Sequence, residues 1–60
     1  MYVVKVGEFY VRDVEIYGQI VSEVELSKEI MRNFSLKWAN VIAKQLNGEV
    51  IEINEEVTNE

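Results

Sequence analysis

The start of the chain alternates hydrophobic and polar residues in the manner of a β-hairpin. Two β-prone runs in YVVKVGEFYV flank Gly7 and Glu8, and a glycine at the first central position suits a type II′ turn. Counting outward from this turn places one set of side chains together on a single face. We expect that face to form the core, with Val4, Val6, Phe9 and Val11.

The alternation slips by one residue at Arg12 and Asp13. Before this point the apolar positions are odd-numbered, and after it they are even-numbered, at Val14 and Ile16. A β-bulge would return both sets to the same face, whereas a bend at which the second strand ends would explain the slip equally well. Both interpretations remain open from the sequence.

A third strand is predicted by QIVSEVEL, which follows a turn at Tyr17 and Gly18. The alternation in this stretch is regular and defines two faces. One face carries Ile20, Ser22, Val24 and Leu26, and the other carries Val21, Glu23 and Glu25.

A helix is predicted to begin after Ser27, whose hydroxyl can accept hydrogen bonds from early backbone N–H groups. Asn47 and Gly48 supply the stop, with Gly48 suited to the left-handed conformation. At helical spacing, one broad sector is apolar and should cover the sheet. Its members are Ile30, Met31, Phe34, Trp38, Val41, Ile42 and Leu46.

The run EVIEI predicts a fourth strand, and the polar, acidic stretch after it predicts a flexible tail. We therefore expect one α+β domain over residues 1–54, with element order β-β-β-α-β, and an acidic tail over residues 55–60. A right-handed crossover through the helix would make strand four parallel to strand three. This gives a mixed four-stranded sheet with one helix packed on one face. The expected strand order is 3-2-1-4, with strand four beside strand three as the alternative.

Composition narrows the class of protein. A chain of 60 residues buries only about 60% of its unfolded surface and has little stability to spare. It has no cysteine and no histidine, so disulfides and the best metal ligands are missing. No apolar run approaches the length of a membrane span, and no signal peptide is recognisable, so we expect a cytoplasmic protein.

Candidate chemistry is sparse. Neither histidine nor cysteine is available as base or nucleophile, and the three glycines are isolated, so no phosphate-binding loop can form. A net charge of −5 argues against binding nucleic acid through phosphate contacts. We expect no enzymatic activity, no cofactor, no metal, and neither direct nucleic-acid nor membrane binding.

The sheet face turned away from the helix is the predicted contact surface. It combines apolar side chains with charges of both signs, which suggests a protein partner or a second copy of the chain. The expected partner-binding residues are Val3, Tyr10, Arg12, Val21, Glu23 and Glu25.

Taken together, YVVKVGEFYV, a third strand, the helix KWANVIAKQLNGEV and the acidic end resemble short uncharacterised proteins encoded in the early regions of Gram-positive phage genomes. The resemblance implies a binding role, since many such products look like modulators of host proteins. Our hypothesis is a small protein-interaction module. The alternatives are an acidic nucleic-acid mimic that blocks a DNA-binding protein, and a structural component that forms homo-oligomers.

Overall fold

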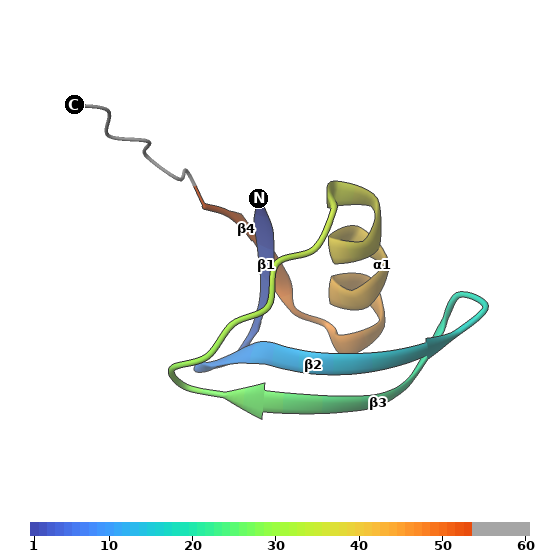
Figure 1. Ribbon diagram of the computed structural model, residues 1–60, viewed down its shortest axis with the longest axis horizontal. Coiled ribbons are helices and arrows are strands. Elements are labelled where there is room, and N and C mark those ends of the chain that lie inside the picture. The colour runs from blue at the N-terminus through green and yellow to red at the C-terminus, as the bar shows by residue number, and fades with distance from the viewer. Residues whose placement is uncertain (54–60) are drawn as a thin grey trace.

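The computed structural model describes residues 1–53 as four strands and one helix (Figure 1). The predicted acidic tail, residues 55–60, and the last residue of the predicted domain lie outside the described residues. The elements are β1 (Tyr2–Val6), β2 (Phe9–Tyr17), β3 (Ile20–Ser27), α1 (Leu36–Leu46) and β4 (Glu49–Glu52). The predicted α+β class and the element order are confirmed.

All strands belong to one sheet with the order β3-β2-β1-β4, as predicted. Every neighbouring pair is antiparallel, however, so the expectation of a mixed sheet with a parallel strand four was wrong. The first turn agrees with prediction, because Gly7 has a φ of 64° and Glu8 does not have a positive φ, as a type II′ turn requires.

β2 leaves β1 soon after the first turn. Only Lys5 with Tyr10 and Val6 with Phe9 are paired between these strands. Of the two interpretations of the slip at Arg12 and Asp13, the bulge is correct, because Val11 pairs with Leu26 and Asp13 pairs with Glu25, which leaves Arg12 as the extra residue. A bulge bends its strand and increases the local twist. The β2–β3 ribbon therefore runs across β1 and β4 rather than alongside them (Figure 1).

The space left beside β1 is occupied by residues 28–35, which we call the return segment. Its Arg32 N–H donates to the Val11 carbonyl at 3.1 Å, and its Phe34 N–H donates to the Tyr2 carbonyl at 2.8 Å. These contacts carry the chain from the end of β3 back to the start of β1. The return segment thus continues the sheet where β2 departs from it.

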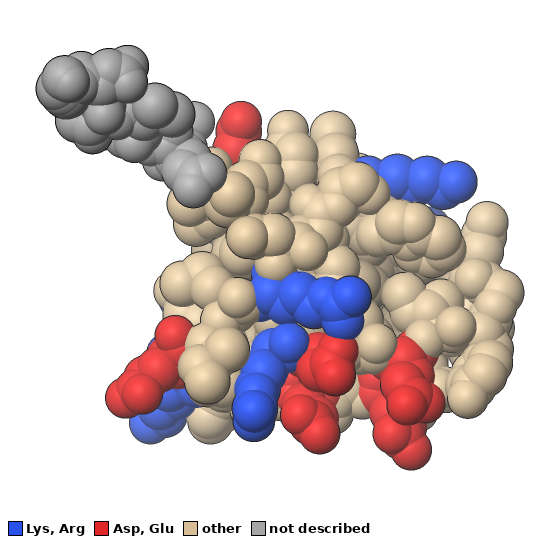
Figure 2. Space-filling view, in the orientation of Figure 1, with Lys and Arg blue, Asp and Glu red and all other residues tan. Residues whose placement is uncertain are grey.

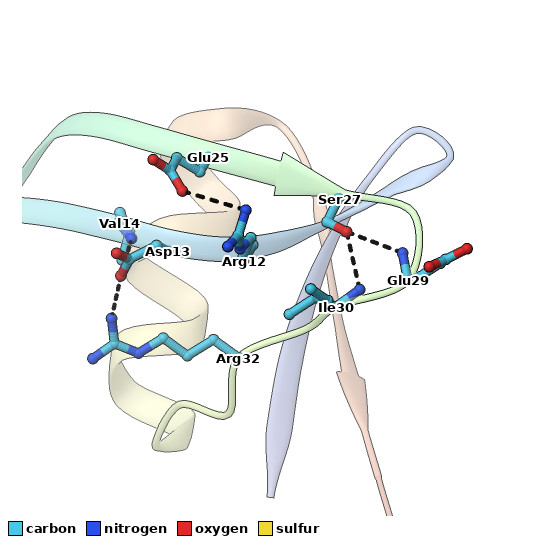
Figure 3. Close-up of polar contacts among 8 residues, drawn as sticks. All are labelled: Arg12, Asp13, Val14, Glu25, Ser27, Glu29, Ile30 and Arg32. Carbon is cyan, nitrogen blue, oxygen red and sulfur yellow. Dashed lines mark hydrogen bonds and ion pairs between the residues drawn. The ribbon is translucent and has the colours of Figure 1, made fainter.

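The return segment also explains why the predicted helix start at Ser27 was wrong. The Ser27 hydroxyl does accept from the N–H groups of Glu29 and Ile30, at 3.1 and 3.0 Å, but no helix follows (Figure 3). The N-cap is Ser35, whose side chain accepts from the Trp38 N–H at 3.4 Å. The predicted hydrogen bonds to the Ser27 hydroxyl are therefore present, but the residues after Ser27 pair with the sheet instead of forming a helix.

The direction of strand four follows from the same path. Because the return segment has already brought the chain back to the start of β1, α1 runs from that end to the opposite one. β4 must then leave from beside Lys5 and run antiparallel to β1, with Val4 opposite Val50 and Lys5 opposite Glu49. A helix that began at Ser27 would have left β4 parallel.

The core lies where α1 packs on β1 and β4. Its buried members come from β1, β2 and the helix, and the half-buried side chains around them include Phe34 and Leu46. The buried cluster consists of Val4, Val11, Ala39, Ile42 and Ala43. Ile30 and Met31, expected in the core, are exposed because they lie in the return segment rather than on the helix.

Gly48 is needed for close packing and not for a left-handed backbone. The left-handed residue is Asn47, with φ 59° and ψ 42°, so the prediction for Gly48 was wrong. A Cβ atom on Gly48 would lie 2.6 Å from the Lys5 carbonyl oxygen and 3.0 Å from a Val6 methyl group. The chain between α1 and β4 therefore passes directly against β1.

Gly48→Ala should lower the free energy of unfolding by about 1–3 kcal/mol, because backbone atoms must move to admit the methyl group. Asn47→Gly is the matched control, since glycine adopts the left-handed conformation without strain, and it should stay within about 0.5 kcal/mol of the parent. Urea denaturation followed by Trp38 fluorescence measures both. Equal stability of the two variants would contradict the packing role of Gly48.

Candidate protein-binding surface

Val3 was predicted to lie on an open face, and this is wrong. Its side chain has no exposed surface, although it points away from the helix side of the sheet that its neighbour Val4 faces. β1 is a central strand, and on this side Val3 pairs with the half-buried Ile51 and lies one row from the longer Lys5. Val3 is therefore unavailable for docking.

Val21 was also assigned to the wrong face. A second bulge, which the alternation did not reveal, lies in β3: Glu15 pairs with Glu23 and Ile16 pairs with Val21, so Ser22 is the extra residue. The bulge turns Val21 to the core side, where it packs half-buried against the cluster. Val50 of β4 packs against the cluster as well.

The other four predicted residues stay on the accessible side. Tyr10 is half-buried, with the Lys5 ammonium 5.9 Å from the centre of its ring. Arg12 and Glu25 are exposed, and their charged groups lie 3.9 Å apart (Figure 3). Glu23 is exposed. Because Val3 and Val21 do not belong to it, this surface consists mainly of charged side chains.

The most exposed large apolar side chains were not predicted to be functional. They are Tyr17, 68% exposed, and Ile20, 64% exposed, and they pair across the tip of the β2–β3 hairpin. The turn lies one residue later than expected, at Gly18 and Gln19, which makes Tyr17 the end of a strand. Recognising the bulge at Ser22 would have placed Ile20 on the outer face, and continuing the alternation of Val14 and Ile16 places Tyr17 there.

The hairpin tip is held in place by the helix. The side-chain oxygen of Gln45 accepts from the Val21 N–H at 2.9 Å, and its amide nitrogen donates to the Gln19 carbonyl at 2.6 Å. One side chain thus holds the turn and the start of β3 against the helix. Tyr17 and Ile20 are presented on a tethered scaffold, which reduces the entropy lost when they bind.

Below the tip, carboxylates face one another on adjacent strands. Glu15 pairs with Glu23, and Asp13 pairs with Glu25. Like charges directly opposite each other destabilise a sheet. We call the three outward rows the hairpin face: Asp13 with Glu25, Glu15 with Glu23, and Tyr17 with Ile20. Figure 2 shows acidic side chains gathered along this ribbon, with Lys and Arg among them.

Two arginines offset only one of these rows. Arg32 bonds Asp13 at 2.5 Å and Arg12 lies 3.9 Å from Glu25 (Figure 3). Within residues 1–53, no Lys or Arg nitrogen comes within 4.0 Å of the Glu15 or Glu23 carboxylate. The row next to the apolar tip is therefore an uncompensated pair of negative charges.

A groove of about 320 Å³ lies on the inner side of the same hairpin. It exists because α1 packs on β1, β4 and part of β3 but leaves the middle of β2 uncovered. Its apolar lining comes from β2, the return segment and the first turn of the helix, and all four apolar side chains are half-buried. The lining consists of Val14, Ile16, Phe34 and Trp38, with Arg32, Asn33 and Ser35 at the margin.

Two cations lie beside aromatic side chains that line this groove, and one of them, Arg32, lines it as well. The Arg32 guanidinium is 5.5 Å from the Phe34 ring centre, and the Lys37 ammonium is 5.6 Å from that of Trp38. The first turn of α1 contains no acidic residue that would offset the positive end of its dipole. The groove thus combines an apolar floor with a cationic margin.

A metal-binding cluster and a membrane-spanning helix are both absent from the part of the chain that the structure covers. Residues 1–53 contain no group of three acidic side chains arranged to hold a metal ion. No helix within them has the length and apolar character required to cross a bilayer. No protein-family model, curated protein or solved structure matches the sequence or fold of this chain.

Glu23→Lys should raise the free energy of unfolding by about 0.2–1 kcal/mol, because it replaces repulsion from Glu15 by attraction. Glu49→Lys is the matched control with the same change of charge. It places a lysine opposite Lys5 and should lower the free energy of unfolding by a similar amount. Urea denaturation at low salt tests both, and a destabilised Glu23→Lys variant would contradict the repulsion described here.

Proposed function

We propose that this protein is a small non-enzymatic protein-binding module that docks through the hairpin face. The observation that supports this function is the position of Tyr17 and Ile20 beside Glu15 and Glu23. Two large apolar side chains left in water gain only a cross-strand contact with each other, and two carboxylates placed opposite each other destabilise the sheet. Both features become favourable when a partner covers the tip and supplies positive charge.

The chemistry of the partner follows from that arrangement. Tyrosine and isoleucine at a tethered tip would enter an apolar pocket, and tyrosine is among the residues enriched in binding hot spots. The adjacent carboxylates would pair with lysine or arginine at the margin of that pocket, which sets orientation and raises the association rate. The partner is therefore a protein with an apolar pocket and a cationic margin.

A nucleic-acid mimic remains a second candidate, supported by the rows of carboxylates. It is weaker, because Arg12 and Arg32 lie against two of the four acidic groups. Binding by a nucleic-acid mimic would depend on its charged groups alone, so it would persist when the apolar tip is removed. The double variant described next separates the two functions.

Tyr17→Ser/Ile20→Ser should abolish binding while leaving the fold intact, because both side chains are exposed. The immobilised parent, this double variant and Leu36→Ser as an exposed apolar control are each exposed to a lysate of a Gram-positive bacterium, the host type that the phage resemblance suggests. Proteins retained by the parent and by Leu36→Ser, but not by the double variant, would support the proposed function. Equal retention by all three would overturn the assignment to the hairpin tip.

A further inference from the structure

The groove of this chain offers the chemistry that its own hairpin face requires. An apolar tip beside two free carboxylates needs an apolar pocket with a cationic margin, and Val14, Ile16, Phe34 and Trp38 line such a pocket. We infer that the hairpin tip of one copy docks into the groove of a second copy. This inference rests on the proposed function and names a partner for it.

The fit is supported first by size and exposure. A groove of about 320 Å³ lies at the lower end of the range for sites that enclose a small ligand, which suits one aromatic ring and not an extended peptide. Its four apolar side chains are only half-buried in the isolated chain. Docking of Tyr17 would remove apolar surface from water on both copies, which is the main favourable term in association.

Charge supports the same pairing. Glu15 and Glu23 form the row next to the tip, so they would reach the margin of the groove when Tyr17 enters it. Arg32 lines the groove beside Phe34, and Lys37 lies beside Trp38, another of the lining residues. Arg32 already bonds Asp13, so Lys37 contributes the larger share of free positive charge.

The contact joins two different surfaces, so each copy carries both halves of it. Two copies that exchange tips form a closed dimer with two-fold symmetry, whereas a one-way contact is heterologous and continues from copy to copy into a ring or a filament. Ile16 lines the groove and Tyr17 is its immediate neighbour at the tip, so both halves lie at the same end of the hairpin. The buried area is small, and we expect weak association in the micromolar to millimolar range.

Sedimentation equilibrium of the purified parent tests this inference. We expect a concentration-dependent mass above the 7.0 kDa of one chain. Raising the salt concentration should weaken the association, because the charged margin is exposed. Tyr17→Ser/Ile20→Ser, which removes the tip, and Arg32→Glu/Lys37→Glu, which reverses the margin, should each weaken it at least tenfold. Asn33→Glu, a milder change of the groove, replaces the second variant if that one fails to fold.

Mixing the two variants supplies the decisive control. The tip variant keeps an intact groove and the groove variant keeps an intact tip, so an equimolar mixture should associate more strongly than either variant alone. No recovery in the mixture would overturn the tip-in-groove contact. A parent that stays monomeric at millimolar concentration would overturn self-docking. The proposed function would still stand if the tip variant lost the proteins that the parent retains from the lysate.

Discussion

The two backbone hydrogen bonds that attach the return segment to the sheet determine the rest of the structure. Arg32 and Phe34 donate to the carbonyls of Val11 and Tyr2, and these carbonyls are available because β2 bends away from β1 at Arg12. Buried or half-buried carbonyl groups need partners, so the gap beside β1 must be filled by backbone. The return segment fills this gap, and its position determines where α1 begins, in which direction β4 runs and which strip of β2 the helix leaves uncovered.

This constraint separates what the sequence predicted from what it did not. Alternation around Gly7 and the slip at Arg12 are local signals: the hairpin that the first predicted is present, and the bulge, one of two interpretations of the second, is present too. Ser27 carried an equally good local signal for a helix start, yet the chain there pairs with distant strands. Hydrogen bonds between residues far apart in the sequence leave no trace in local periodicity, so the direction of β4 could not be predicted.

Only part of the candidate surface could be predicted from the sequence, because features outside the local pattern determine the rest. Tyr10, Arg12, Glu23 and Glu25 lie on the accessible side, as their alternation indicated, but the bulge at Ser22 reversed Val21. Bulges shift every later residue to the opposite face, so one missed bulge moved the apolar part of the surface from the middle of the sheet to its tip. Val3 is buried on a central strand and pairs with Ile51 of β4, and periodicity within β1 cannot reveal such a neighbour.

In this small domain, the surface left for binding is a consequence of how the chain closes its sheet. Covering β1 and β4 with the helix completes the core, and the β2–β3 ribbon extends beyond it with an apolar tip, an acidic row and an open inner groove. Gln45 holds that ribbon against the helix, so tip and groove keep a fixed relation. Two complementary surfaces on one rigid scaffold are what self-docking requires.

The most direct test is a dilution series of ¹⁵N-labelled protein, followed by amide chemical shifts over about two orders of magnitude in concentration. Self-docking predicts concentration-dependent shifts in two groups of residues, one around Tyr17 and Ile20 and one from Arg32 to Trp38, with the β4 amides unchanged. Shifts confined to β4, or a spectrum independent of concentration, would contradict it.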